Sequence, residues 1–463
     1  MTSKTGDKSM YAYTLLDDSA ALPDPGEDSC GVLTVEPTGN GVLVEDVDPI
    51  DQSKLTSSCE TFWNICNTIQ GLPILAIPYA VRNGGYVAIC ALMVIAIASN
   101  YTAQTIVSCL YERPAPGDKS GKRKRVRESF VDIGRAFSPK FGHHLVLVTE
   151  IAQLLFLAAV YPRMVGRMLA KSFPSTDISC MLWTLFGGIA FIPNIFLQNL
   201  SQVAWTSIIT VLSAKVIFIA VFTYSAMQYQ MWELASLDNF EIHTFPSALG
   251  ILVASYLSQP FVPVIEGSMR KKEHFNLLMN IAYTSMTVLN IIIGVVAYIS
   301  FRPNTAEVIT NSLPEGSFRR TINVMASLLV FTSYTLPMFT IFDIIQNAKL
   351  PCIRHNFGAS VRDPDVVAFR FSLVSASIAM AALVPRFTYM LALVGSIAGI
   401  SLEFIFPSLF HVKIYFSSLS WWEIAVDVSV LSLGLFFLST GTYFSMRSIV
   451  TSKCCSNPAD PCY

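Results

Sequence analysis

Apolar residues run through this chain in long blocks that are separated by short polar stretches. An α-helix needs about 20 consecutive apolar residues to cross the hydrocarbon core of a bilayer, so blocks of this length predict about eleven membrane-spanning segments. They cover residues 59–82, 86–111, 143–170, 180–198, 203–226, 246–268, 276–301, 319–346, 367–385, 387–412 and 421–445.

The composition agrees with this pattern. Of the 463 residues, 52% are hydrophobic and only 14% are charged, and the mean hydropathy is +0.51. Soluble domains contain about 25% charged residues. The chain is therefore predicted to be an all-α membrane protein, and its net charge of -1 gives no indication of a nucleic-acid partner.

Two polar tails flank the predicted membrane domain of residues 56–446. Residues 1–55 are acidic, rich in Gly and Pro and without an apolar block, which predicts a disordered cytosolic tail and no signal peptide. This tail contains the sequence YTLL, from Tyr13 to Leu16, which matches a tyrosine-based signal for sorting adaptors. Residues 447–463 form a short C-terminal tail.

Lys and Arg in the loops predict the orientation of the segments. The loops at residues 113–142, 270–275 and 347–366 are basic, and all three lie on one side if the N-terminus is cytosolic. The opposite loop at residues 227–245 has acidic residues and no Lys or Arg. With an odd number of segments, the C-terminus is then lumenal.

Gly and Pro interrupt two of the segments. The first contains Gly71, Pro73 and Pro78, and the sixth contains Pro260 and Pro263. A broken helix is tolerated at membrane depth only where its freed backbone groups face protein or a water-filled cavity. Breaks at matching positions five segments apart indicate two inverted repeats of five helices, with a substrate site between them. Freed N–H and C=O groups could bind the carboxylate and the ammonium of an amino acid.

We therefore predict a substrate site at the two breaks. Its candidate residues are Asn64, Asn67, Gly71, Leu72, Pro73, Ile74, Ser255, Tyr256, Ser258 and Gln259.

Ionisable residues at membrane depth are a second set of candidates, because each costs about 2.5–3.5 kcal/mol at a helix centre. Glu266, Glu150 and Glu403 are predicted to couple transport to an ion gradient. Thr332 and Ser333 could supply oxygen atoms to a cation, although hydroxyls also satisfy helix backbones, and both interpretations remain open. The six His residues show no metal-ligand spacing and the ten Cys residues form no C-x-x-C pair, so neither an enzyme nor a metal or cofactor site is predicted.

Five blocks carry a resemblance to a known family: WNICNTIQGLPILAIPYAVRNGGY, YTAQTIVSCLYE, FPSALGILVASYLSQPFVPVIEGSM, VITNSLPEGSFRRTINV and VGSIAGISLEFIFPSLFH. The chain resembles the amino acid/auxin permease family, and within it the vesicular transporters of the inhibitory amino acids GABA and glycine. The resemblance covers nearly everything after residue 55. It implies the fold of the amino acid-polyamine-organocation transporters, with substrate at the first and sixth helices and transport driven by a proton or cation gradient. In the third segment the chain departs from that pattern, since it has Glu150 and Gln153 where those transporters have Gln and then Glu.

These observations predict a secondary active transporter of small neutral amino acids, GABA- or glycine-like, in a synaptic-vesicle membrane. It would work by alternating access and antiport, driven by a proton gradient or membrane potential, with sodium or chloride as alternative coupling ions. One alternative keeps the fold in a plasma-membrane or lysosomal symporter coupled to sodium or protons. Another is an amino acid sensor that does not transport.

Overall fold

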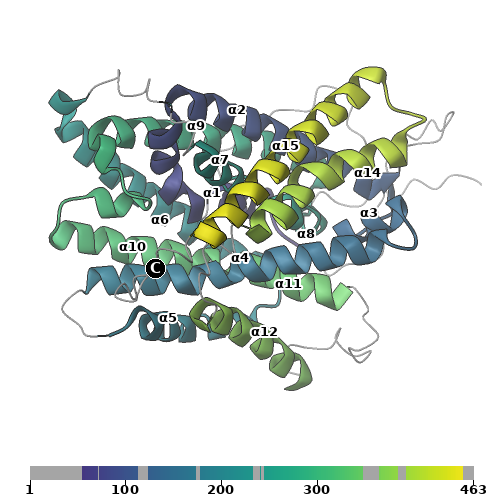
Figure 1. Ribbon diagram of the computed structural model, residues 1–463. Coiled ribbons are helices and arrows are strands. Elements are labelled where there is room, and N and C mark those ends of the chain that lie inside the picture. The colour runs from purple at the N-terminus through teal and green to yellow at the C-terminus, as the bar shows by residue number, and fades with distance from the viewer. Residues whose placement is uncertain are drawn as a thin grey trace, which may run out of the picture. The chain divides into compact units, whose positions relative to one another are not determined.

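The computed structural model describes residues 55–70, 72–112, 124–173, 178–232, 240, 245–347, 364–383 and 393–451. Gly71 and the predicted sorting signal at Tyr13 to Leu16 lie outside the described residues, as do residues 1–54 and 452–463 of the predicted tails. Within the described ranges the chain is helical except for one two-stranded antiparallel ribbon (Figure 1). The ribbon consists of β1 (Tyr111–Glu112) and β2 (Lys124–Arg125).

The helices follow the predicted apolar blocks in order. Up to residue 231 they are α1 (Ser58–Gln70), η2 (Leu72–Ala76), α2 (Ile77–Leu110), α3 (Phe130–Phe137), α4 (Gly142–Ser172), α5 (Cys180–Ile189), η3 (Ile192–Phe196), α6 (Leu200–Met227) and η4 (Tyr229–Met231). After it they are α7 (Phe245–Ala254), η6 (Gln259–Phe261), α8 (Val262–Gly267), η7 (Lys272–His274), α9 (Phe275–Phe301), η8 (Arg302–Asn304), η9 (Ile309–Ser312), α10 (Ser317–Ser333), α11 (Thr335–Asn347), α12 (Pro364–Leu383), η10 (Gly395–Gly399), η11 (Ser401–Ile405), α14 (Phe406–Tyr415) and α15 (Trp421–Thr451).

In the described part of the chain, nine helices are long and apolar enough to cross a membrane. The first runs over 53 residues, Ser58–Leu110, and contains the first two predicted segments, while Met181–Phe196 is apolar but shorter. Large apolar side chains such as Ile97 and Trp205 are exposed on the outside of the bundle, as lipid contact requires. The prediction of an all-α protein that crosses the membrane many times is confirmed.

The first and second segments are joined by a bend without a loop. Gly85 has φ 52° and ψ -135°, which glycine adopts more readily than other residues, and α2 bends there. The neighbouring Gly84 has no room for a side chain, because a Cβ would lie 2.7 Å from the Cβ of Ala88 and 2.9 Å from the ring of Phe245. The sequence NGG therefore lets α2 turn back closely against α7.

Both predicted breaks are present. In the first segment, 3₁₀ helix η2 separates α1 from α2, and in the sixth, residues 255–258 are not helical and η6 leads into α8. Pro78 and Pro263 stand in the first turn of α2 and α8. A missing N–H costs nothing at that position, so these two prolines begin the second half-helices rather than interrupt them.

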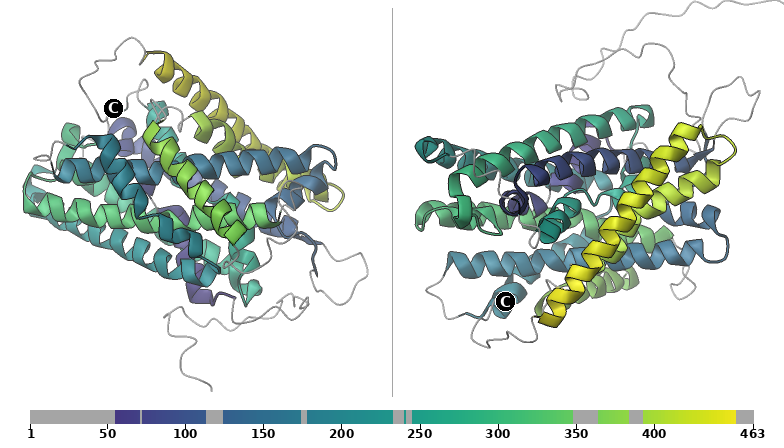
Figure 2. Two further views of the ribbon diagram at one scale, coloured as in Figure 1. Left: turned by 90° about the horizontal axis from the view of Figure 1, so that it is seen from below. Right: turned by 45° about the horizontal axis from the view of Figure 1, so that its top comes forward.

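The broken helices lie inside the bundle, where α1 packs against α6, α9 and α8, and α7 packs against α2 and η2. Figures 1 and 2 show α4 between α10 on one side and the pair α5 and α12 on the other. α15 crosses over α14 and the π-helical turns η10 and η11. This arrangement brings η11, α4 and α9 toward the two breaks.

Candidate functional site

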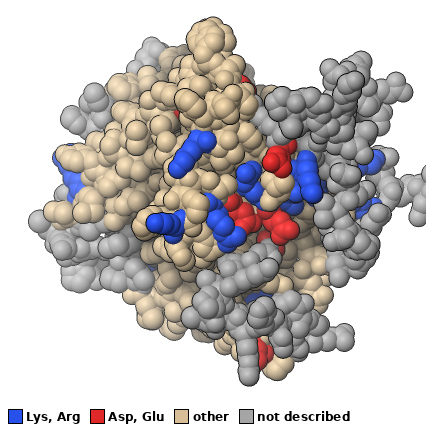
Figure 3. All heavy atoms as spheres, turned by 90° about the vertical axis from the view of Figure 1, so that its right-hand side faces the viewer, with Lys and Arg blue, Asp and Glu red and all other residues tan. Residues whose placement is uncertain are grey.

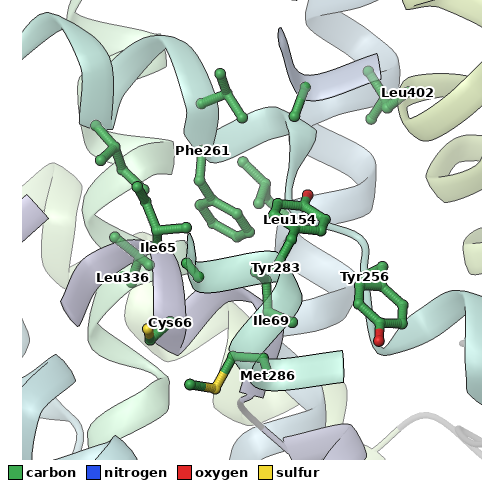
Figure 4. Close-up of a cluster of buried hydrophobic side chains, with 14 of the residues drawn as sticks. Ile65, Cys66, Ile69, Leu154, Tyr256, Phe261, Tyr283, Met286, Leu336 and Leu402 are labelled. Carbon is green, nitrogen blue, oxygen red and sulfur yellow. The ribbon is translucent and has the colours of Figure 1, made fainter. Parts of the chain in front are cut away.

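Hydrophobic side chains from several helices fill the space around the breaks. Phe261, at the end of η6, is 3% exposed. Figure 4 shows its ring among labelled side chains of α1 (Ile65), α4 (Leu154) and α9 (Tyr283). Polar groups in this region are therefore cut off from bulk water and need partners within the protein or on a ligand.

The break in the sixth segment has such partners. Gln259 is fully buried, and its Nε2 donates to the carbonyl oxygen of Ser99 at 3.0 Å and to Thr102 Oγ1 at 2.8 Å. Its Oε1 accepts from the backbone N–H of Ser258 at 3.1 Å. The Ser258 hydroxyl in turn is hydrogen-bonded to the Tyr283 hydroxyl. Hydrogen bonds thus hold the sixth-segment break against α2 and α9.

Two further candidates of this break are also engaged. The Tyr256 hydroxyl lies 2.8 Å from Thr287 Oγ1, and its ring is stacked on Tyr283 with the centroids 6.0 Å apart. Ser255 Oγ donates to the carbonyl oxygen of Ile251 at 3.0 Å. The structure therefore places all four candidates of the sixth segment in contacts that hold the break in shape.

The polar residues of α1 differ. Asn64 is fully buried, and neither its amide nitrogen nor its amide oxygen has a hydrogen-bond partner among the described residues. Asn67 donates to Ser207 Oγ at 3.0 Å, but its Oδ1 is unpaired, as is Oε1 of the buried Gln70. Residues three apart lie on one face of a helix, so these groups form a row of unpaired polar atoms that leads to the first break.

The remaining candidates of the first segment follow this row. Ile74 is 2% exposed and Pro73 is half-buried, and both belong to η2. Gly71 and the side chain of Leu72 lie outside the described residues. The structure therefore brings the α1 row and η2 together at one place.

Two buried carboxylates lie deep in the bundle. Glu403 stands in the π-helical turn η11, is fully buried, and has both oxygens unpaired among the described residues. The groups that face it are the Ser99 hydroxyl and the backbone amides of Ser258 and Gln259, at the second break. Glu150 of α4 is 2% exposed, with Oε2 unpaired and Asp343 as its charged neighbour. Of the two, Glu403 is the one that faces a break.

Glu266 lies elsewhere, in the last turn of α8. It is fully buried, accepts a hydrogen bond from the Tyr111 hydroxyl, and forms an ion pair with Arg125, whose nitrogen is 3.2 Å away. Burial and the neighbouring carboxylate raise the pKa of Tyr111, so that its hydroxyl stays protonated and donates. We call Tyr111, Arg125 and Glu266 the Glu266 cluster.

The segment before α1 covers the same end of the bundle. Thr56 pairs with the segment after α8: its N–H donates to the carbonyl oxygen of Ser268 at 2.7 Å, and its own carbonyl accepts from the N–H of Arg270 at 3.1 Å. Met269, between these two residues, is fully buried. This pairing and the Glu266 cluster together seal the end of the bundle that carries α3.

The opposite end is hollow. A cavity of about 300 Å³ lies between the start of α2, the end of α4 and the segment around η9. Arg82 and Arg167 are among its lining residues, and Arg82 donates to the carbonyl oxygen of Thr305 at 2.9 Å and lies over the Tyr79 ring. Contacts thus close the end that carries α3, which we call the sealed end, and a cavity lies at the opposite end.

Of the two hydroxyl candidates in the eighth segment, Thr332 contacts α6 and Ser333 is hydrogen-bonded within its own helix. Thr332 Oγ1 accepts from Thr210 Oγ1 at 2.7 Å and donates to carbonyl oxygens of its own helix. Ser333 Oγ donates to the carbonyl oxygen of Leu329 at 2.8 Å. Over the described residues, no group of three or more His, Cys, Asp or Glu is placed to hold a metal ion.

Sequence reasoning missed Tyr111, Arg125 and Tyr283. Arg125 lies in a basic loop, which predicts only the orientation of the segments. Tyr111 follows the end of α2 and Tyr283 lies within α9, and both helices have ordinary apolar sequences. Their partners are 155 residues away from Tyr111 and 25 residues away from Tyr283 along the chain. No local pattern could have indicated these contacts.

Residues 54–447 match the family model described as "Transmembrane amino acid transporter protein". The chain belongs to this family. It is 30% identical over 419 residues to the vesicular inhibitory amino acid transporter of Xenopus tropicalis, covering 88% of this chain and 80% of the relative. It is 31% identical to the human protein of the same name, covering 86% and 77%, and 27% identical to the vesicular GABA transporter of Caenorhabditis elegans, covering 86% and 81%.

Solved transporter structures share the fold of this family member. MHP1, a nucleobase-cation-symport-1 family transporter in a closed conformation with bromovinylhydantoin bound, superposes with a TM-score of 0.52 at 14% identity, over 87% of this chain and 95% of that one. MhsT in complex with L-phenylalanine gives a TM-score of 0.52 at 10% identity, over 86% and 98%. The predicted family and the inverted-repeat fold with broken first and sixth helices are confirmed, and the relatives are transporters, not enzymes.

Proposed function

We propose that the protein moves small neutral amino acids, GABA- or glycine-like, across a vesicle membrane by alternating access. The observation that carries this proposal is the row of unpaired polar atoms on α1, which leads to the first break. One end of the bundle is closed by contacts, and a cavity lies at the opposite end. Unpaired buried amides are costly unless a ligand or water completes them. The names of the relatives support the substrate class and the vesicle membrane, and the sorting signal at Tyr13 is consistent with such a location.

The sealed end is proposed to be cytosolic. Lys and Arg side chains gather with several Asp and Glu on the face seen from the right-hand side of Figure 1, where α3 lies (Figure 3). Short loops on the cytosolic side of a membrane protein carry an excess of Lys and Arg. The cavity beside Arg82 then opens to the lumen, and the C-terminus is lumenal. Opening of the sealed end and closure of the cavity would complete the transport cycle.

The coupling ion is proposed to be a proton, with sodium or chloride as alternatives. Glu150, Glu266 and Glu403 are buried carboxylates on three different helices. Proton relays in transporters are built from such groups. Glu266 is the first candidate, because the ion pair and hydrogen bond that it makes at the sealed end change with its charge.

The test of transport is uptake of a panel of labelled amino acids into proteoliposomes that contain the purified protein. We expect accumulation of GABA or glycine under an imposed pH gradient without sodium. Uptake that requires sodium would favour the symporter alternative. Specific binding of an amino acid without any flux would favour a sensor.

Glu266→Gln tests the coupling role. The amide keeps the size of the side chain and removes its charge, so we expect the variant to lose gradient-driven accumulation but to retain exchange of labelled for unlabelled substrate. Glu315→Gln is the matched control, since that carboxylate is 88% exposed and lies outside the Glu266 cluster. If Glu266→Gln accumulates substrate with an unchanged dependence on pH, Glu150 and Glu403 become the candidates.

A further inference from the structure

Three polar side chains from three helices meet inside the protein. His411 of α14 is 4% exposed and Asp427 of α15 is fully buried. His411 Nδ1 lies 2.7 Å from Asp427 Oδ2, and the hydroxyl of Tyr101 on α2 donates to Asp427 Oδ1 at 2.9 Å. Both carboxyl oxygens accept hydrogen bonds when the group is ionised and Nδ1 carries a proton. We call these residues the Asp427 trio.

Other charges near the trio have partners of their own. Lys413 points to α3, where it lies over the ring of Phe137 at 4.3 Å. Glu423, one turn before Asp427, accepts hydrogen bonds from Ser420 at the start of α15. The elements packed around α14 also carry Glu403 on η11 and Asp132 and Arg135 on α3. Of the titratable groups in the described chain, Tyr101 is hydrogen-bonded to Asp427, and Tyr415, one turn along α14, makes a ring contact with His411.

The trio can bind one proton without changing its hydrogen bonds. Because Nδ1 is hydrogen-bonded to Asp427, Nε2 is the ring nitrogen of His411 that would take up the proton. Before binding, the site holds one net negative charge, and afterwards it is a neutral imidazolium–carboxylate pair. At low dielectric, such a change alters the electrostatic energy of the surrounding helices strongly.

A continuous chain of contacts joins the trio to the sealed end. The ring of Tyr415 lies edge-to-face with that of His411, with the centroids 5.7 Å apart. The Tyr415 hydroxyl donates to the carbonyl oxygen of Ser108 at 2.8 Å and to that of Tyr111. Tyr111 in turn donates to Glu266. An imidazolium attracts an aromatic ring more strongly than a neutral imidazole does, so protonation of His411 competes with the bonds that Tyr415 makes to the end of α2.

We propose that the Asp427 trio is a proton-binding site whose occupancy is transmitted to the sealed end through Tyr415 and Tyr111. Proton binding at His411 loosens the seal at Thr56 and the Glu266 cluster. The inference rests on the alternating access proposed above and adds to it a proton site remote from both breaks.

Thiol labelling tests the inference without any substrate, so its outcome is independent of whether the amino acids of the panel are transported. A cysteine in place of the buried Met269 reports opening of the sealed end. Lys271→Cys, at an exposed position nearby, corrects for the effect of pH on the reagent, and the protein without an introduced cysteine gives the background. Labelling with an impermeant maleimide is measured at about pH 5.5 and about pH 7.5.

We expect the corrected labelling of Met269→Cys to be at least about fivefold faster at the lower pH, as for typical couplings between sites. His411→Gln and Asp427→Asn, which keep approximate side-chain size but remove the hydrogen-bonded pair, should weaken this pH dependence. Any dependence that remains is assigned to Glu266, the other proton-binding candidate at the sealed end. Tyr101→Phe removes one hydrogen bond and leaves the pair, so it should keep the dependence.

Tyr415→Phe decides the case even if the trio variants do not reach the membrane. It leaves the trio intact and removes the hydrogen bonds to α2, so the pH dependence should weaken to the same extent as in His411→Gln. Two results would show that the trio only holds the helices together. One is a labelling rate of the parent Met269→Cys protein that does not change with pH. The other is an unchanged pH dependence of this rate when Tyr415→Phe or His411→Gln is added.

Discussion

Gly and Pro interrupt the first and the sixth segments alike, but the polar side chains beside the two breaks have different partners. At the sixth-segment break, Gln259 and Ser258 are hydrogen-bonded to α2 and α9. On the first segment, Asn64, Asn67 and Gln70 keep unpaired atoms in the described structure. Hydrogen bonds within the protein hold the sixth-segment break, whereas unpaired polar atoms beside the first-segment break are available to a ligand. The same sequence signal thus marks a hydrogen-bonded scaffold in one repeat and, in the other, the surface that we propose binds substrate.

Loss of the scaffold should have the largest effect. Gln259→Leu keeps approximate size and removes three hydrogen bonds of the Gln259 amide, those to the Ser99 carbonyl and the Thr102 hydroxyl and the one from the Ser258 N–H. Their loss costs about 3 kcal/mol of unfolding free energy. We expect a lower midpoint of thermal unfolding for the purified protein, together with loss of uptake. A protein as stable as the parent would show that the second break is not held by Gln259.

Loss of the unpaired row should affect transport and not stability. In Asn64→Leu, no partner within the described structure is lost, and removal of an unsatisfied buried amide should leave the unfolding free energy within about 1 kcal/mol of the parent value or raise it. Uptake should nevertheless be abolished. If Asn64→Leu instead showed a large drop in the thermal midpoint and uptake at the parent rate, the roles assigned to the two breaks would be reversed.

The smallest effect is expected at the eighth segment. Thr332→Val removes a hydroxyl that bridges to Thr210 and to its own helix, at a cost of about 1 kcal/mol. We expect uptake within about a factor of two of the parent rate, without a requirement for sodium. A sodium-dependent uptake that Thr332→Val removes would instead support the cation site that the sequence left open.

The fold follows from local patterns in the sequence. Apolar block length predicts the spans, and the prolines at residues 73, 78, 260 and 263 predict the breaks, because both depend on residues close together in the chain. The sequence NGG similarly indicates the gap between the first two segments, although only the backbone of Gly85 shows that a bend replaces the loop.

The partners at the site could not be predicted in this way. Whether Gln259 faces substrate or Thr102 depends on how two helices distant in sequence pack together. Likewise, Glu266 follows a break in the sequence, but the structure places it with Tyr111 and Arg125 at the sealed end. Candidate residue types were recognisable, but their division into scaffold, proposed binding surface and seal required the tertiary contacts.

Equilibrium binding of the labelled amino acid identified in the uptake panel tests most directly the claim that the first break holds the substrate. The purified parent protein, Asn64→Leu and Glu266→Gln are compared at equal amounts of folded protein. We predict that binding is lost in Asn64→Leu and retained in Glu266→Gln, because the first residue stands in the unpaired row and the second at the sealed end. Unchanged binding in Asn64→Leu, with loss in Glu266→Gln, would contradict the assignment.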